Sequence, residues 1–379
     1  MYMNTITGQY EPVKNVEVKV SRLLRTDTVF TDENGYFEVD RTYRHANIKL
    51  YFRNDNARVI SSQDGLLNFV LTTTYSEPTR SENELVGIEI KFNEKTLENK
   101  YATIIDAVED YKSYAIENNI ALPPFLRIMA IKPAMGMAFM GRYAFPGISL
   151  ATELASLIYR FGESFDNPIA SFIGTIQAIN SLAVGLPGAA LLHSFVPDIF
   201  VGTEPSYYFY GETELIQHIV YHELAHASHF VAAGPEYWRN NYVAMLGEWI
   251  KQIPKAIFGG GIDPYGENPP DLVKLIESWA YFVGYHIIYE NYSNRPLEHY
   301  VQNVINRYEE ALEDNTISFY NPAFYKLKGD LGYSVDRMFL VLSPTVVDHI
   351  GYVEGLINKY GGDEEKIKEI FEDTGLVEF

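Results

Sequence analysis

The sequence contains no cysteine among its 379 residues. This absence excludes thiol catalysis, disulfide bonds and zinc sites built from thiolates. It does not assign a redox compartment, because a cysteine-free chain suits an oxidising and a reducing environment equally well. Any zinc site in this chain would have to be built without thiolate ligands.

The chain also lacks a long uninterrupted hydrophobic run. Its most apolar stretch, residues 169–200, is broken by polar side chains and by several glycines and prolines. A membrane-spanning helix needs about 20 predominantly apolar residues in a row, so we predict no transmembrane span. Residues 1–5 have neither the basic start nor the apolar segment of a signal peptide.

Basic residues are few, since 30 Lys and Arg stand against 50 Asp and Glu and give a formal net charge of −20. Such a chain repels nucleic acid and anionic membrane surfaces, and no basic cluster offsets the acidic excess. We therefore expect no nucleic-acid partner. With 47% hydrophobic residues and enough length for two or three domains, the chain is expected to be globular.

Residues 1–93 show the alternating pattern of β structure. The alternating segments are residues 16–20, 48–52 and 86–92. A period of two is typical of strands with one buried face. Asn34-Gly35 favours a tight hairpin turn between a strand ending at Phe30 and one beginning at Tyr36. Several short strands separated by turns predict an N-terminal β-sandwich.

The pattern then becomes mainly helical. Apolar residues recur at helical spacing over residues 101–115, residues 126–131 are typical of a short strand, and helices dominate from Thr213 onward. Asn268-Pro269 is typical of a helix start, with Asn as the cap and Pro in the first turn.

This change of pattern near residues 93–97 predicts a multidomain protein. The β-sandwich would occupy residues 1–93, and a mainly α domain of the α+β class would occupy residues 97–379.

Residues 214–230 carry the strongest chemical signal. They contain neither glycine nor proline and have apolar faces, so we predict a helix. His222 and His226 lie four residues apart, which places both imidazoles on one face, where they can bind one Zn²⁺. Glu223 lies beside the metal, where it can accept a proton from a zinc-bound water and pass it to a leaving amine. The pattern predicts hydrolysis of a peptide or protein substrate.

A catalytic zinc needs a third protein ligand and one open position. Glu277 is the preferred candidate, because it lies on a second apolar helix, where a carboxylate is costly unless it is paired or binds a metal. Asp263 is the alternative ligand, or it orients a ligand histidine. His229 lies too far along a straight helix to share the ion, and no glycine turns the chain after His226. We expect His229 either to pack in the core or to contact the ligand residues without binding the metal itself.

The oxyanion that forms during hydrolysis needs a donor besides the metal. Tyr281, Tyr285 and His286 follow Glu277 on the same predicted helix. Tyr281 lies one turn beyond Glu277 and is the preferred donor, and packing in the core is the alternative role for all three.

The motif His222-Glu223-Leu224-Ala225-His226, with Glu277-Ser278-Trp279-Ala280 downstream, resembles the gluzincin metallopeptidases. The resemblance covers two short motifs. It implies a zincin-like domain in which His222, His226 and Glu277 bind Zn²⁺ and Glu223 is the general base. The position before the ligand glutamate is commonly Asn in such peptidases, and it is Ile276 here.

The N-terminal region resembles a second family through residues 12–18 (PVKNVEV) and 31–37 (TDENGYF). That family is the carboxypeptidase regulatory-like domain, a transthyretin-like β-sandwich. Its usual Gly-x-Val opening is replaced here by Gly8-Gln9-Tyr10. Such domains commonly belong to secreted or surface-anchored bacterial proteins. The resemblance therefore implies an extracytoplasmic location, with the signal sequence absent from this chain.

A surface binding protein is the alternative function. The sandwich and a surface rich in the 29 tyrosines would then capture peptide or glycan, and the zinc site would be structural or vestigial. A closed site with four ligands would support this alternative. Glu223 argues against it, because a structural zinc site has no use for a base.

Overall fold

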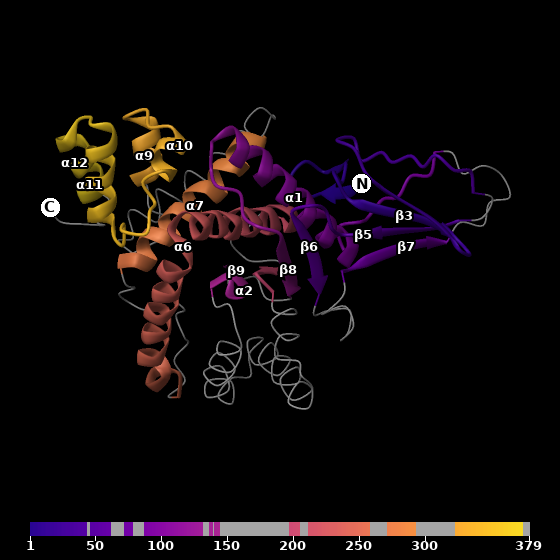
Figure 1. The fold of residues 1–379 in the computed structure, drawn as a ribbon, viewed down its shortest axis with the longest axis horizontal. Coiled ribbons are helices and arrows are strands. Elements are labelled where there is room, and N and C mark those ends of the chain that lie inside the picture. Colours follow the sequence, from indigo (N-terminus) through magenta and orange to yellow (C-terminus); the bar gives the residue numbers. More distant parts are fainter. Residues whose placement is uncertain are drawn as a thin grey trace. The chain divides into compact units, whose positions relative to one another are not determined.

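The structure is a computed structural model, and the residues that it describes are 1–43, 46–61, 72–78, 87–131, 136–138, 140–144, 197–204, 211–257, 271–292 and 323–373. They form an N-terminal region with an antiparallel sheet and a largely helical C-terminal part (Figure 1). This arrangement is compatible with the predicted multidomain α+β class.

The chain divides into two compact units. One comprises Met1–Ser113, Pro124–Phe139 and Leu191–Glu223, and the other comprises Tyr114–Pro123, Met140–Ala190 and Leu224–Phe379.

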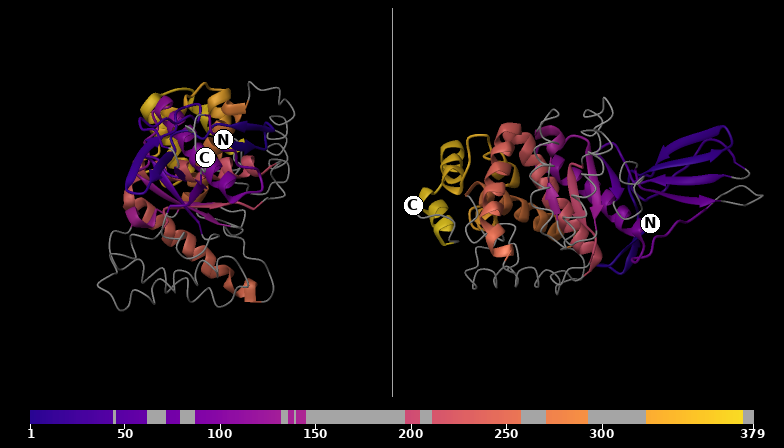
Figure 2. Two further views of the ribbon diagram at one scale, coloured as in Figure 1. Left: turned by 90° about the vertical axis from the view of Figure 1, so that its right-hand side faces the viewer. Right: turned by 90° about the horizontal axis from the view of Figure 1, so that it is seen from below.

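The N-terminal antiparallel sheet has the strand order β4-β3-β5-β7. Its strands are β3 (Glu17–Arg22), β4 (Arg25–Phe30), β5 (Asn47–Tyr51) and β7 (Thr74–Pro78). Figures 1 and 2 show these strands side by side. Val18 faces Leu50 and Val20 faces Ile48 across the β3–β5 pair, and all four side chains are buried. The alternation over residues 16–20 and 48–52 therefore predicted two strands correctly.

The predicted hairpin at Asn34-Gly35 was only half right. The turn forms, since Gly35 has a φ of 69° and its amide donates to the carbonyl of Asp32 at 2.9 Å. However, the residues after Tyr36 are not a strand, and β4 pairs instead with β3 through a turn at Leu23-Leu24. The Asp32 carboxylate accepts the amides of Asn34 and Tyr36, so the side chain closes this loop locally without a second strand.

The predicted strand over residues 86–92 was also wrong for the part that the structure describes, residues 87–92. Only an isolated bridge between Phe92 and Tyr2 forms there. The amide of Phe92 donates to the carbonyl of Met1, and its carbonyl accepts the amide of Met3, so the first residues of the chain satisfy this backbone. The start of the chain also forms an antiparallel pair of short strands, β1 (Tyr2–Asn4) and β2 (Gln9–Glu11).

A second, mixed sheet has the strand order β6-β8-β10-β9. Its strands are β6 (Ala57–Ser61), β8 (Leu126–Ile131), β9 (Gly136–Ala138) and β10 (Ile199–Gly202). β8 confirms the strand predicted over residues 126–131 and pairs in parallel with β6 and β10, while β9 runs antiparallel to β10. The predicted boundary at residues 93–97 thus lies between two strands, β6 and β8, that share one sheet.

Helix α1 (Leu97–Glu117) lies in the connection between β6 and β8, where two parallel strands require a long crossover. Tyr101, Ile104, Ile105 and Val108 are buried along it, as their helical spacing predicted. The hydroxyl of Tyr101 donates to Oγ of Ser61 at 2.7 Å, which ties the helix to the end of β6.

The helical part contains α6 (Glu212–Ile257), α7 (Asp271–Tyr292), α9 (Ala323–Gly329), α10 (Val335–Phe339), α11 (His349–Tyr360) and α12 (Glu364–Asp373). A short helix, α2 (Gly141–Ala144), follows β9. The predicted helix start at Asn268-Pro269 lies outside the described residues. The rings of Phe282, Phe324 and Phe339 pack around Trp279, with centroids 5.6–5.8 Å away. Among the described helices, none combines the length and apolarity that crossing a membrane requires.

Candidate metal centre

The helix predicted over residues 214–230 is the first part of α6. No glycine or proline interrupts it before Gly234, where φ is 83° and ψ is 170° and the helix breaks. Pro235 then lies in the first turn of the next helical stretch, a position that suits proline. Leu215, Val220 and Leu224 are buried along the first stretch. The apolar face therefore anchors the helix and orients its histidines.

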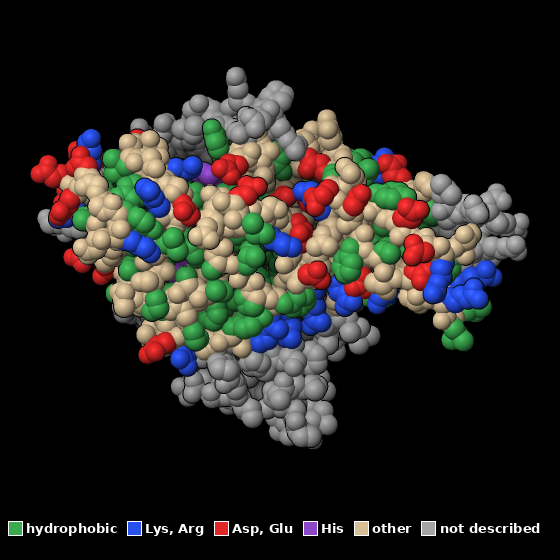
Figure 3. All heavy atoms as spheres, turned by 45° about the horizontal axis from the view of Figure 1, so that its top comes forward, with side chains coloured by type: hydrophobic (Ala, Val, Ile, Leu, Met, Phe, Trp, Pro, Cys, Tyr) green, Lys and Arg blue, Asp and Glu red, His purple; other side chains and the backbone are tan. Residues whose placement is uncertain are grey.

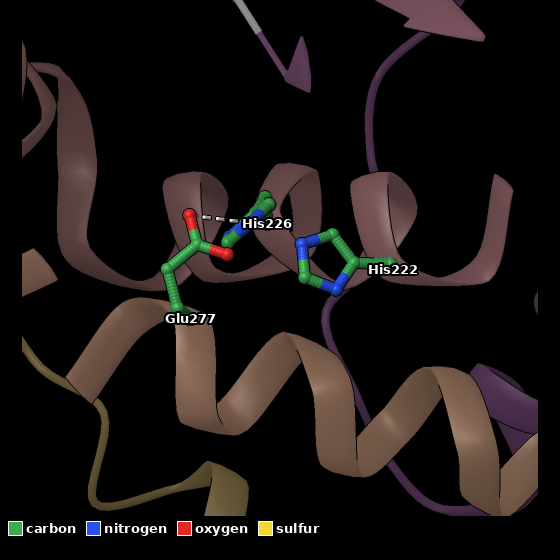
Figure 4. Close-up of side chains that lie close together, drawn as sticks. All are labelled: His222, His226 and Glu277. Carbon is green, nitrogen blue, oxygen red and sulfur yellow. Dashed lines mark ion pairs between the residues drawn. The ribbon is translucent and has the colours of Figure 1, made fainter. Parts of the chain in front are cut away.

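Two helices bring three potential ligands together. His222 and His226 lie one turn apart on α6, and Glu277 lies on α7 (Figure 4). One potential ligand atom from each residue lies within 4.8 Å of the other two. Nε2 of His226 is 3.4 Å from Oε1 of Glu277, and all three side chains are buried. Figure 4 shows the imidazole of His226 and the carboxylate of Glu277 turned toward each other.

The donor set fits a divalent metal such as zinc. Ligand bonds of about 2.1 Å in a tetrahedral site place two ligand atoms about 3.4 Å apart. The His226–Glu277 separation of 3.4 Å already has this value. The other separations lie within 4.8 Å, so side-chain rotation alone would bring all three ligand atoms to this spacing. Two imidazoles and one carboxylate also form a typical three-ligand set for a zinc site with one open position.

Glu223 lies next to this cluster. Its Oε1 is 4.0 Å from Nε2 of His222, and its side chain is buried. Glu223 and Glu277 thus bring two buried carboxylates to the same pair of imidazoles. Burying anionic carboxylates is unfavourable unless a positive charge is near. A bound cation would supply that charge, so the electrostatics agree with the donor geometry.

Gly136 on β9 is a residue near the site that sequence reasoning missed. A Cβ built on Gly136 would overlap Oε1 of Glu223 and would lie 2.8 Å from Cγ2 of Ile219. The absence of a side chain at Gly136 therefore leaves the space that the Glu223 carboxylate occupies. No local pattern indicates this contact, because β9 and α6 are far apart in the sequence.

Two aromatic neighbours of the histidines were also missed. The ring centroids of His218 and His222 lie 6.1 Å apart, and those of Trp238 and His226 lie 5.9 Å apart in an edge-to-face arrangement. His218 had a visible signal, since it precedes His222 by one helical turn. Trp238 had none, because it reaches His226 only after the break at Gly234.

His229 takes no part in the cluster that the described residues form. It is fully buried against Tyr237 and Trp238, with ring centroids 5.2 and 6.1 Å away. Burial, followed by the nearby His226, lowers the pKa of His229 to about 3. This neutral, enclosed imidazole matches the expectation of a core residue.

The remaining candidates from the sequence analysis are Tyr281, Tyr285, His286 and Asp263, and none of them belongs to the cluster of His222, His226 and Glu277 that the described residues form. Tyr281 is half-buried on α7 and stacks on Tyr285 at a centroid distance of 6.5 Å. His286 is buried, its Nδ1 lies 3.1 Å from the hydroxyl of Tyr114, and burial lowers its pKa to about 4. His286 is thus a packed core histidine, whereas the role of Tyr281 stays a prediction. Asp263, the alternative ligand, lies outside the described residues.

Comparisons with protein-family models, curated proteins and solved structures found no match for this chain.

Proposed function

We propose that this protein is a zinc-dependent peptidase in which Glu223 acts as the general base. The observation that carries the proposal is the buried cluster of His222, His226 and Glu277 with the Glu223 carboxylate beside it. A three-ligand site with an adjacent base differs from a structural zinc site, which is closed by four protein ligands. We favour zinc over other metals because paired imidazoles with one carboxylate suit it.

His222, His226 and Glu277 would hold the metal. Zinc in such a site supplies a water of lowered pKa and polarises the substrate carbonyl. The protein contributes rigidity, since the two histidines are fixed one turn apart on α6 and the glutamate comes from the packed helix α7. The aromatic core around Trp279, two residues beyond Glu277, limits the movement of α7 at this point.

Glu223 would move the proton. Its carboxylate accepts the proton of the attacking water as the new C–O bond forms at the peptide carbonyl. It then gives that proton to the amine nitrogen as the C–N bond breaks, so the products are a carboxylic acid and an amine. Because the side chain is buried, bulk water competes little for this proton. Tyr281 is proposed as the donor that stabilises the oxyanion.

A peptide is the proposed substrate because the pattern His222-Glu223-Leu224-Ala225-His226 resembles that of zinc metallopeptidases. In that pattern the glutamate next to the first ligand activates a metal-bound water for attack on a peptide carbonyl. Strand β9 lies beside this glutamate, since its residue Gly136 approaches Glu223.

Further assignments follow from the resemblances. We propose a zincin-like fold of the gluzincin type for the catalytic part and a carboxypeptidase regulatory-like sandwich for the N-terminal sheet region. An extracytoplasmic, secreted or surface-anchored location is proposed on the same ground.

The first experiment measures metal content by elemental mass spectrometry. We expect about one zinc per chain in the purified protein, as one three-ligand site requires. Glu277→Ala should lose this zinc. Glu290→Ala is the matched control, because Glu290 lies exposed on the same helix and should leave the zinc unchanged. Absence of zinc after reconstitution, or its retention in Glu277→Ala, would contradict the assigned ligands.

The second experiment tests hydrolysis of a fluorogenic peptide library. Glu223→Gln should keep its zinc and lose turnover, because an amide cannot accept the proton. Glu236→Gln, exposed on the same helix α6, is the control and should retain activity. Turnover by Glu223→Gln at the wild-type rate would refute the role of Glu223. A zinc-loaded wild type without activity on any peptide would favour the binding-protein alternative.

A further inference from the structure

The turn between β3 and β4 exposes two leucines almost completely. Arg22 and Arg25 pair across the end of the hairpin, so Leu23 and Leu24 form a two-residue loop at its tip. Leu23 is 95% exposed and Leu24 is 102% exposed, more than any other large hydrophobic side chain among the described residues. Isolated exposed leucines are common on proteins, but two adjacent ones that project fully from a hairpin tip are not required by the fold.

The backbone at the tip makes this choice of residues more unusual. Leu23 has a φ of 54°, in the left-handed region. Two-residue hairpin loops usually place glycine or asparagine at such a position, because a larger side chain there is strained. Leucine at this site is therefore unfavourable both for the backbone and for contact with water. A residue that departs from local preference in this way points to a functional requirement.

Two arginines flank the leucines. Arg22 and Arg25 are both exposed, and neither forms an ion pair with any residue that the structure describes. Asp27, the acidic residue that follows on β4, is already engaged: Nη1 of Arg41 lies 3.4 Å from its Oδ1, and the hydroxyl of Tyr43 donates to its Oδ2 at 2.7 Å. The tip is thus locally basic. Figure 3 shows Lys and Arg side chains beside hydrophobic ones at the right-hand end of the view, the end toward which β3, β5 and β7 extend in Figure 1.

We propose that the Arg22-Leu23-Leu24-Arg25 hairpin tip docks this protein onto a lipid bilayer with anionic headgroups. The two leucines would enter the interfacial region, and the two guanidinium groups would bind lipid phosphates. A convex two-leucine tip suits a deformable bilayer, whereas a protein partner would need a preformed pocket.

The acidic charge of the whole chain does not prevent this docking. Charges more than about 8 Å from the contact are largely screened at physiological ionic strength. The interaction is therefore governed by the tip, where the two arginines lie. The expectation that the chain repels anionic membranes rests on its net charge of −20, and the proposed docking departs from it only at this tip.

The test is co-sedimentation of the full chain with vesicles. Vesicles of phosphatidylcholine and phosphatidylglycerol in a molar ratio of about three to one should bind the protein, and phosphatidylcholine alone should bind it less. Arg22→Gln/Arg25→Gln should weaken binding to the anionic vesicles about 25-fold, since each arginine contributes roughly fivefold. Leu23→Asn/Leu24→Ser should weaken binding to both vesicle types at least about tenfold.

The hairpin variants have matched controls on other surfaces. Leu122→Ser/Leu340→Ser removes two leucines that are exposed elsewhere, and Arg239→Gln removes an exposed arginine on α6, so both should bind vesicles as the wild type does. Leu23→Asn should also raise the melting temperature, because asparagine tolerates the left-handed backbone. This gain would show that lost binding does not result from unfolding.

Two outcomes would overturn the proposal. One is the absence of vesicle binding, or binding that the hairpin variants leave unchanged. The other is concentration-dependent self-association that Leu23→Asn/Leu24→Ser abolishes while the protein ignores vesicles, since the tip would then dock onto a second copy of this chain.

Discussion

Replacing Gly136 by alanine should impair hydrolysis while leaving the metal in place. The added Cβ would overlap Oε1 of Glu223, and it would lie 2.8 Å from Cγ2 of Ile219 and 3.0 Å from Cδ of Glu223. Ordinary contacts of a Cβ begin at 3.4 Å. The carboxylate therefore has to retreat by about 1 Å, and a displacement of that size in a catalytic group lowers the rate about 100-fold.

The same substitution should have a moderate effect on stability. Ile219 is buried on α6, so its methyl group can retreat only by disturbing the packing of that helix. Overpacking of this kind costs about 1–3 kcal/mol of the free energy of unfolding. The backbone of Gly136 itself accepts alanine, because its φ is not in the left-handed region. The three atoms nearest to the new methyl group belong to Glu223 and Ile219 and not to a proposed ligand, so the zinc content should stay near that of the wild type.

The assay combines peptide turnover, zinc content and thermal unfolding. Gly329→Ala is the matched control, since a Cβ there would meet no atom within 4 Å, and it should leave all three quantities unchanged. Wild-type turnover in Gly136→Ala would refute the placement of Glu223 against β9. Loss of zinc in this variant would show that the substitution disturbs the ligands rather than the base.

Other substitutions test the remaining parts of the structure. Glu277→Gln should weaken zinc binding at least about 100-fold, as measured by competition with a chelator. Even residues that only hydrogen-bond to a metal ligand affect the metal affinity about 10–100-fold. Tyr281→Phe should lower turnover about 100-fold with unchanged zinc if its hydroxyl stabilises the oxyanion, whereas unchanged turnover would return Tyr281 to a packing role. Burial, then the nearby Asp110, raises the pKa of Asp106 from 3.8 to about 8, so the folded protein retains a proton that the unfolded chain releases. Stability should therefore fall by at most about 1.4 kcal/mol per pH unit as the pH rises from 4 to 8, and Asp106→Asn should flatten this slope in urea unfolding. Trp279→Ala should cost about 3–5 kcal/mol of unfolding free energy, measured in the same way, since it removes the centre of a buried aromatic cluster.

The sequence predicted those parts of the site that depend on one helix. His222 and His226 are placed by helical spacing alone, so their proximity could be foreseen without any tertiary contact. Glu277 could be proposed because a carboxylate within an apolar helix needs a buried partner. Gly136 could not be found in this way, because only the tertiary structure brings β9 against Glu223.

In the fold, too, the sequence predicted features that depend on local pattern and missed those that depend on tertiary contacts. The strands over residues 16–20, 48–52 and 126–131 and the helix over residues 101–115 follow from local alternation and spacing. The pairing of β6 with β8 could not be predicted in this way. An alternation with a period of two shows which side chains share a face of a strand, but it does not show which strands lie next to it. Alternation also failed over residues 87–92, where the backbone bonds to the first residues of the chain replaced a regular ladder.

The parallel pairing of β6 and β8 has a consequence for the order of folding. During synthesis β6 leaves the ribosome before α1 and β8, so the backbone groups of β6 that pair with β8 stay without these partners until the whole crossover has been made. Contacts between distant segments close large loops and therefore slow folding. Until β8 is present, the unpaired edge of β6 can associate incorrectly with other chains. The hairpin of β3 and β4 closes locally and can form early. Nascent chains that end before β8 should therefore depend on chaperones, and chains that extend beyond β8 should depend on them less.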